Sequence, residues 1–140
     1  MRTQPFIKGF EMNEILARDI MIKDVLTITD DRKVASARLK MLRHNIGALP
    51  VLDNNGVLAG IITQRDIDLA GADVSDLLVS DLMTRTLVKA RETTPLHWIV
   101  EQMIKTGIQR IPVTDEDSKL IGLVTQTAVI KAALMYGLLK

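Results

Sequence analysis

Apolar residues recur with a helical period between positions 34 and 42 of this 140-residue chain. The positions that share one helix face are Val34, Ala37, Met41 and Leu42. Thr29-Asp30-Asp31, just before them, offers side chains that cap helix N termini. Asn45, just after them, tolerates the left-handed conformation at which helices often end. We therefore predict a helix between these two signals, preceded by a short β-prone run, Val25–Ile28.

Two apolar runs, Ala48–Leu52 and Val57–Thr63, flank the polar sequence Asp53-Asn54-Asn55-Gly56. Asparagine and glycine between two β-prone runs are typical of a turn, so we predict an antiparallel hairpin here. Both strands are apolar at successive positions, which indicates burial on both faces. A second helix is expected to begin at Gln64 and to reach Ala70.

A sequence repeat with an offset of 62 residues runs through the chain. Gly60–Asp66 (Gly-Ile-Ile-Thr-Gln-Arg-Asp) recurs as Gly122–Ala128 (Gly-Leu-Val-Thr-Gln-Thr-Ala). The other matching segments are Asp19–Met21 with Asp81–Met83, and Ile46–Asp53 with Ile108–Asp115. A duplicated unit folds as two similar lobes, and small ligands bind in the clefts between lobes. The largest chemical difference between the copies is Asp66 against Ala128.

The second copy is expected to form the same elements as the first. Thr94-Pro95 predicts the start of its first helix, with the threonine as cap and the proline at the first helical position, and Gly107 predicts its end. Asp115–Ser118 is its predicted hairpin turn, and Thr127–Leu139 is its predicted last helix. The connector between the copies, Gly71–Ser80, carries apolar residues that suit packing against the repeats.

Three strands and two helices per copy leave one face of each sheet without cover. We therefore predict a mixed α/β (α+β) fold of two β-α-β-β-α repeats. The repeats are expected to pack sheet against sheet about a pseudo-twofold axis and to form two equivalent clefts. The predicted boundaries are residues 1–16 for an N-terminal arm, 17–78 for the first repeat and 79–140 for the second.

The composition, with 47% apolar and 25% charged residues, is that of an ordinary globular protein. A formal net charge of +1 and 3% aromatic residues argue against an extended nucleic-acid interface. The absence of cysteine excludes disulfides and thiolate metal sites, and the two histidines have no third ligand at metal spacing, so no metal is expected. No apolar run suits a signal peptide or a membrane span, so we expect a cytoplasmic protein.

Thr63 and Thr125 each close an apolar strand and open a helix. Backbone N–H groups at such a junction, together with the positive helix end, can bind a phosphate. Asp66 lies one turn further on the same face, and its carboxylate can accept hydrogen bonds from two ribose hydroxyls. The Thr-x-x-Asp spacing is equally that of a capping box, in which the two side chains secure the helix start. Both interpretations are compatible with the sequence.

The ordered motifs Asp-Ile-Met, Ile-Gly-Ala-Leu-Pro-Val-Leu-Asp and Gly-Ile-Ile-Thr-x-x-Asp resemble those of the cystathionine-β-synthase (CBS) domain. Their repetition resembles a Bateman module, a tandem pair of CBS domains, over residues 17–138. The resemblance implies two inter-repeat clefts that bind adenosine-type ligands such as AMP, ADP, ATP or S-adenosylmethionine. We expect no catalytic cofactor. It also implies frequent assembly of two such pairs into a flat disc.

In this family the threonine and aspartate of the last motif hold phosphate and ribose, and the base lies against the opposing repeat. The resemblance therefore implies a ligand site made of Ile61, Thr63, Asp66, Thr84, Leu87, Ile108 and Arg110. The equivalent second cleft would contain Ile22, Val25, Ile46, Ala48, Leu123 and Thr125. This cleft departs from the pattern, because Ala128 cannot accept from ribose hydroxyls and Ala48 stands where the first site has Arg110. Arg110 is either a phosphate ligand or a surface residue paired with Asp115 or Asp117.

No catalytic constellation indicates an enzyme: the chain has no Ser/His/Asp set in suggestive order, no cysteine nucleophile and no enclosed carboxylate pair. We expect a regulatory module that binds an adenosine nucleotide and signals to a client protein. A homodimer is expected, because the last helix and the helix of Trp98 have more apolar surface than one chain covers. Two alternatives remain, namely an oligomerisation or docking module with vestigial clefts, and a regulatory part detached from an enzyme or a transporter.

Overall fold

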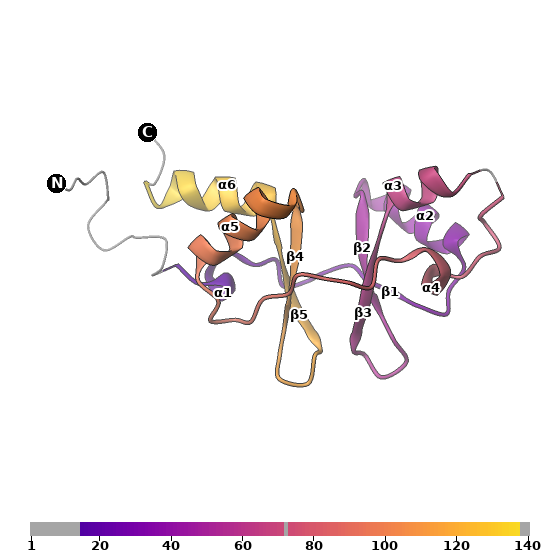
Figure 1. Cartoon of the computed structure of the whole chain (residues 1–140), viewed down its shortest axis with the longest axis horizontal. Helices are drawn as coiled ribbons and strands as arrows, with labels where there is room; N and C mark the ends of the chain where they lie inside the picture. The colour runs from indigo at the N-terminus through magenta and orange to yellow at the C-terminus, as the bar shows by residue number, and fades with distance from the viewer. Residues whose placement is uncertain (1–14, 72, 138–140) are drawn as a thin grey trace. The chain divides into compact units, whose positions relative to one another are not determined.

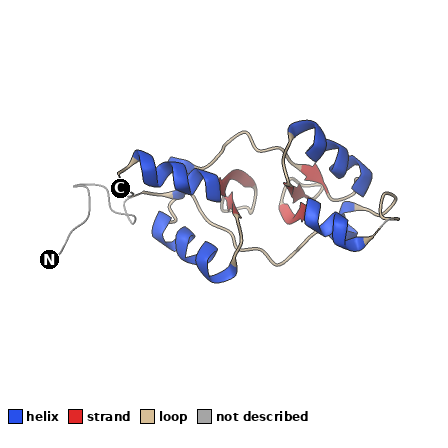
Figure 2. Ribbon diagram, turned by 90° about the horizontal axis from the view of Figure 1, so that it is seen from above, coloured by secondary structure: helices blue, strands red, loops and turns tan. Residues whose placement is uncertain are grey.

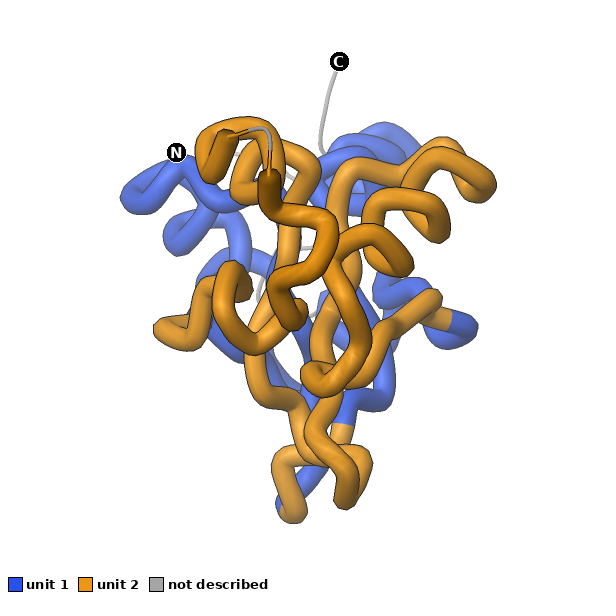
Figure 3. The backbone as a smooth tube through the Cα atoms, turned by 90° about the vertical axis from the view of Figure 1, so that its right-hand side faces the viewer, with its two compact units in different colours: residues 1–24, 88–116, 120–140 blue, residues 25–87, 117–119 orange. Residues whose placement is uncertain are grey.

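The computed structural model describes residues 15–71 and 73–137. These residues divide into two compact units, which Figure 3 colours separately. The repeat-1 unit consists of Val25–Leu87 with Asp117–Lys119. The repeat-2 unit falls within Met1–Asp24, Val88–Glu116 and Leu120–Lys140. The units do not coincide with the sequence repeats, because each repeat's first segment packs with the other repeat.

The sheet of the repeat-1 unit has the strand order β1-β2-β3. β1 (Ile28–Thr29) is parallel to β2 (Ala48–Leu52), and β2 is antiparallel to β3 (Leu58–Thr63). The register pairs Ala48 with Thr63. The predicted hairpin is therefore confirmed, whereas the first strand begins only at the last residue of the predicted β-prone run.

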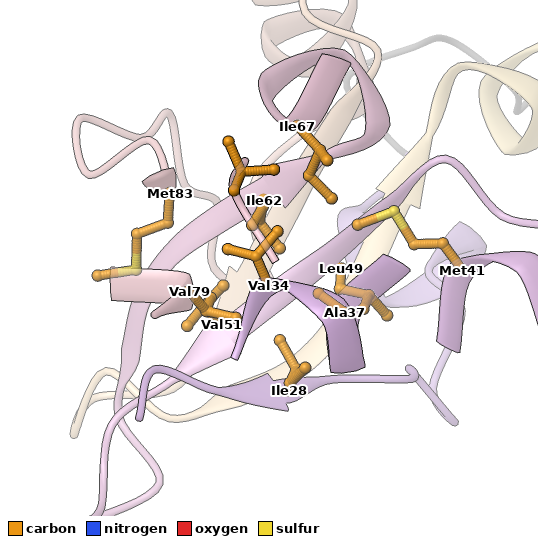
Figure 4. Packing of buried hydrophobic residues seen from close by; sticks show 11 residues of the cluster. Ile28, Val34, Ala37, Met41, Leu49, Val51, Ile62, Ile67, Val79 and Met83 are labelled. Carbon is orange, nitrogen blue, oxygen red and sulfur yellow. The ribbon is translucent and has the colours of Figure 1, made fainter. Parts of the chain in front are cut away.

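The helices of the repeat-1 unit lie on one face of this sheet (Figure 1), and Figure 2 shows the same layering from above. They are α2 (Val34–His44), α3 (Gln64–Ala70) and the short α4 (Val79–Leu82). Their inward side chains and those of the strands form one core, most of it labelled in Figure 4: Ile28, Val34, Ala37, Met41, Leu49, Val51, Ile62, Ile67, Val74, Val79 and Met83. This core ties the connector residue Val74 and the segment around α4 to the first repeat.

The start of α2 differs from the prediction. Its N-cap is Lys33, whose side chain makes no capping hydrogen bond. The backbone N–H of Val34 instead donates to the carbonyl oxygen of Leu77 at 2.8 Å. The predicted cap at Thr29–Asp31 is therefore wrong, because the connector supplies an acceptor for the free helix start. The prediction that the connector packs on the repeats is confirmed, since Val74 is only 3% exposed.

The repeat-2 unit has an equivalent arrangement. β4 (Arg110–Thr114) and β5 (Leu120–Thr125) form an antiparallel hairpin. Ala90 makes a parallel bridge to Val113, where β1 pairs with β2 in the repeat-1 unit. The helices of this unit are α1 (Ala17–Ile20), α5 (Leu96–Thr106) and α6 (Gln126–Met135).

The start of α5 also differs from the prediction. Pro95 is the N-cap rather than the first helical residue, and the Thr94 hydroxyl oxygen accepts from the Arg91 N–H at 2.8 Å. The Leu96 N–H donates to the carbonyl oxygen of Ile15 at 2.7 Å. The predicted Thr94 cap is wrong because a backbone segment from far along the chain takes its place.

The helix ends were predicted more successfully than the helix starts. Asn45 and Gly107 end α2 and α5 in the left-handed conformation, with φ angles of 52° and 74°, as predicted. α6 begins one residue earlier than predicted, and it ends at Met135, four residues before the predicted end at Leu139, with Tyr136 as its C-cap. Residues 1–14 of the predicted arm and residues 138–140 lie outside the described residues. Within the part of the chain that the structure describes, no helix has the length and apolar character needed to span a bilayer.

Candidate functional site

Thr63 and Asp66 form a complete capping box at the start of α3. The Asp66 N–H donates to the Thr63 hydroxyl oxygen at 3.0 Å, and the Thr63 N–H donates to Asp66 Oδ2 at 2.9 Å. The Gln64 N–H donates to the Gly47 carbonyl oxygen of the neighbouring strand segment. Because N–H groups of successive residues point to opposite sides of a strand, the N–H of the preceding residue, Thr63, points away from β2 and can donate to Asp66. Within the described residues Asp66 Oδ1 has no hydrogen-bond partner, so the box leaves one carboxylate oxygen available to a ligand.

The outer edge of β3 also carries the backbone of Thr84. Ile61 N–H donates to the Thr84 carbonyl oxygen at 3.0 Å, and Thr84 N–H donates to the Ile61 carbonyl oxygen at 2.8 Å. Thr63 N–H is the next group that points out along this edge. The structure therefore brings together four of the predicted site residues, Ile61, Thr63, Asp66 and Thr84, in the repeat-1 unit. Leu87 belongs to the same unit.

Gly60 permits this close approach of the Thr84 segment to β3. A Cβ atom at Gly60 would lie 2.7 Å from the Thr84 carbonyl oxygen and 2.9 Å from the sulfur of Met83. The equivalent Gly122 of β5 is packed instead against the side chain of Met21, with Sδ the nearest atom. The Met83 and Met21 segments are thus held tightly on β3 and β5.

The outer edge of β5 in the repeat-2 unit has the same hydrogen bonds as the outer edge of β3, except that the carboxylate acceptor is missing. Ile22 and Leu123 exchange two backbone hydrogen bonds of 2.8 and 3.0 Å, as Thr84 and Ile61 do. The Thr125 hydroxyl oxygen accepts from the Ala128 N–H at 3.1 Å. Ala128 has no side-chain oxygen to accept from the Thr125 N–H, so the capping box is only half made.

A pocket of about 340 Å³ lies in the repeat-2 unit beside Ile22, Thr125 and Ala128. It extends along α6 to Lys131 and Met135 and is bounded by Asp19 of α1. The sequence interpretation did not include the α6 and α1 residues. The signal was present, because positions 128, 131, 132 and 135 follow one another at the spacing of one helix face.

A second pocket, of about 490 Å³, lies in the repeat-1 unit at the C-terminal end of α2. Arg38, Asn45 and Gln64 are polar residues of its lining, and Ile46 of the predicted second cleft is part of its wall. In the described parts of the chain, no three His, Asp or Glu side chains are grouped so that they could hold a metal ion.

Each predicted site draws residues from both units. Ile108 and Arg110 lie in the repeat-2 unit, whereas Thr63 and Asp66 lie in the repeat-1 unit. Val25, Ile46 and Ala48 of the second cleft lie in the repeat-1 unit, whereas Ile22, Leu123 and Thr125 lie in the other. The membership of all these residues in a ligand site stays a prediction, including that of Thr63 and Asp66. Arg110 is half-buried and makes no ion pair among the residues described.

Two solved structures are similar to this fold. The CBS domain pair of protein MJ0100, solved with 5′-methylthioadenosine and S-adenosyl-L-methionine, has a TM-score of 0.78 and 31% identity, and the match covers 89% of this chain and 98% of that one. CBSX2, solved in complex with AMP, has a TM-score of 0.79 and 27% identity, and the match covers 87% of this chain and 98% of that one.

The family model of the CBS domain matches residues 17–73 and 79–134. This chain therefore belongs to the CBS domain family, and its two repeats are a tandem pair. The predicted resemblance and the mixed α+β fold class are thereby confirmed.

Sequence relatives include complete enzymes and small proteins. Inosine-5′-monophosphate dehydrogenase of Methanocaldococcus jannaschii is 35% identical over 115 residues, which are 82% of this chain and 23% of that enzyme. Protein YlbB of Bacillus subtilis is 35% identical over 112 residues, which are 77% of this chain and 75% of that protein. The chain thus spans only 23% and 26% of the length of the inosine-5′-monophosphate dehydrogenases of Methanocaldococcus jannaschii and Thermoplasma acidophilum.

Proposed function

We propose that this CBS pair is a regulatory module that binds one adenosine-type ligand per chain and signals its presence to a client protein. The ligand's ribose would be held by Asp66, its phosphate by Thr63 and Arg110, and its base by the backbone around Thr84 and Ile108. Candidate ligands are AMP, ADP, ATP and S-adenosylmethionine. We propose no catalytic activity for the chain itself.

The observation that carries this proposal is that only one of the two carboxylate oxygens of Asp66 accepts a hydrogen bond within the described residues. One oxygen is held by the Thr63 N–H at 2.9 Å, which fixes the side chain, and Oδ1 has no partner among the described residues. A fixed, half-buried acceptor gives stronger and more selective hydrogen bonds to hydroxyl groups than a mobile surface carboxylate. The solved relatives with adenosine-type ligands support the same class of ligand.

Titration calorimetry with AMP, ATP and S-adenosylmethionine tests the proposal. Asp66→Ala removes charge-assisted hydrogen bonds to ribose, and it should weaken binding by at least about tenfold. The matched control is Asp81→Ala, because Asp81 Oδ2 accepts from the Leu78 N–H at 2.9 Å in the same capping geometry. Asp81 is not a predicted ligand residue, so this variant should lose stability while retaining ligand affinity.

The competing interpretation assigns Thr63 and Asp66 to capping alone and makes the protein an oligomerisation or docking module. The complete capping box and the apolar helix faces support it: Leu42, Ile104 and Leu134 are 70%, 78% and 70% exposed. Under this interpretation Asp66→Ala and Asp81→Ala would lose similar stability and no adenosine ligand would bind. A homodimer formed through these apolar helix faces is compatible with both interpretations, and we propose that the protein forms such a dimer.

A further inference from the structure

The pocket of the repeat-2 unit differs chemically from an adenosine site. Its volume is about 340 Å³, which suits a small organic molecule. Its apolar lining comes from two segments, with Ile20 and Ile22 in one and Ala128, Ala132 and Met135 of α6 in the other. Ala128 replaces the carboxylate that would accept from ribose hydroxyls, so this pocket lacks the recognition element of the repeat-1 unit.

Two opposite charges line this mostly apolar pocket, whose other polar residues are Thr125, Thr127 and Tyr136. Asp19 uses Oδ2 to accept from the Leu16 N–H at 2.8 Å, and its other oxygen has no partner in the described chain. Lys131 forms no ion pair with any described residue. Both side chains line the pocket from different helices, α1 and α6. A ligand with one positive and one negative group would be complementary to this pair.

The pocket also has a backbone donor without its usual acceptor. Gln126 N–H donates to the Gln109 carbonyl oxygen at 2.8 Å, so Arg110 and Thr125 face each other as a non-hydrogen-bonded pair. The Thr125 N–H therefore points away from β4, as the Thr63 N–H does from β2. In the repeat-1 unit a carboxylate accepts there, and in the repeat-2 unit the carboxylate of a ligand can do so.

We propose that this pocket binds a free α-amino acid with an apolar side chain. Its carboxylate would accept from the Thr125 N–H and pair with Lys131. Its ammonium group would donate to the free oxygen of Asp19. Its side chain would lie against Ile20, Ile22 and the apolar residues of α6. This site uses residues other than Thr63 and Asp66, so it does not depend on the adenosine proposal.

Titration calorimetry with L-leucine and L-methionine tests this proposal, with two leucine analogues as controls. Leucinamide lacks the carboxylate and 4-methylpentanoate lacks the ammonium group. Each analogue should bind at least roughly tenfold more weakly than L-leucine, because leucinamide loses the negative charge that pairs with Lys131 and 4-methylpentanoate loses the ammonium contact to Asp19. Absence of saturable binding by either amino acid up to about 10 mM, where even a millimolar ligand is mostly bound, would overturn the proposal.

Two variants assign the binding to this pocket. Ala128→Asp should restore the capping box on the Thr125 N–H, raise stability and abolish leucine binding by occupying the place of the ligand carboxylate. Lys131→Met should weaken leucine binding, whereas Lys131→Arg retains the charge and should preserve it. Unchanged leucine affinity in both Ala128→Asp and Lys131→Met would overturn the assignment.

A last measurement separates the two proposed sites. L-leucine should still bind to Asp66→Ala protein, and saturating AMP should not displace it from wild-type protein. Competition between AMP and leucine for one site would show a nucleotide pocket and overturn the proposal. Failure of AMP to bind anywhere would contradict the adenosine proposal alone.

Discussion

Gly60→Ala measures how closely the Met83-Thr84 segment must approach β3. The new Cβ would lie 2.7 Å from the Thr84 carbonyl oxygen and 2.9 Å from Met83 Sδ, and both distances are shorter than van der Waals contact. Gly60 is not among the residues with positive φ, so alanine meets no backbone strain there. The cost of the substitution is therefore steric.

The nearest atom decides the size of this cost. The Thr84 carbonyl oxygen belongs to the backbone and accepts from the Ile61 N–H at 3.0 Å, so it cannot move without disturbing that hydrogen bond and its 2.8 Å counterpart. Overpacking costs about 1–3 kcal/mol and each weakened hydrogen bond about 1 kcal/mol. We expect Gly60→Ala to lower the free energy of unfolding by about 2–4 kcal/mol.

Gly122→Ala is the matched control in the repeat-2 unit. There the nearest atoms all belong to the flexible side chain of Met21, which can change rotamer, so a loss of about 1 kcal/mol is expected. Urea denaturation of both variants gives the free energies, provided that the slope of the transition is unchanged. A Gly60→Ala protein as stable as wild type, or no less stable than Gly122→Ala, would refute the argument that the Thr84 backbone limits the space.

Three further predictions concern a helix end, assembly and partners. Asn45→Ala should lower the free energy of unfolding by about 1 kcal/mol, since alanine tolerates the φ of 52° poorly, and Asn45→Gly should not; equal losses in urea denaturation would contradict this. The wild-type protein should scatter light as a dimer even at high salt, and Leu134→Glu, on the exposed face of α6, should give a monomer; a monomeric wild type at micromolar concentration would end this proposal. No sub-micromolar complex with duplex DNA or RNA is expected at about 150 mM salt in a gel-shift assay, because few phosphates can be neutralised, and a tight, steeply salt-dependent complex would overturn this.

Features encoded by neighbouring residues were predictable from the sequence. The hairpin follows from two apolar runs around Asp53–Gly56, and the ends of α2 and α5 follow from Asn45 and Gly107. Thr63 and Asp66 were singled out by their spacing, and the structure places them together through two hydrogen bonds. In each case the residues that determine the geometry lie within a few positions of one another.

Features that depend on distant segments were missed. The helix starts were misassigned because the acceptors for Val34 and Leu96 are the carbonyl groups of Leu77 and Ile15, which no local pattern specifies. The pocket beside Ala128 was missed because the spacing of positions 128, 131, 132 and 135 indicates one face of α6 but not that α1 meets it from the opposite end of the chain. Thr94 and Thr29–Asp31 have the residue types of caps, but backbone from elsewhere satisfies the helix starts.

The pairing of Thr84 with β3, and of Ile22 with β5, has a consequence for folding during synthesis. β3 is complete before Thr84 leaves the ribosome, and the only matching segment available until then is Asp19–Ile22 of the same repeat. The correct partner of Ile22, Leu123, emerges later, and residues 88–140 need roughly 3–10 s to be made. We therefore expect the nascent chain to pair its first Asp-Ile-Met segment with β3 and to release it again when the second arrives. A strand-exchange step of this kind would make the folding rate sensitive to the relative affinity of the two segments for one strand edge.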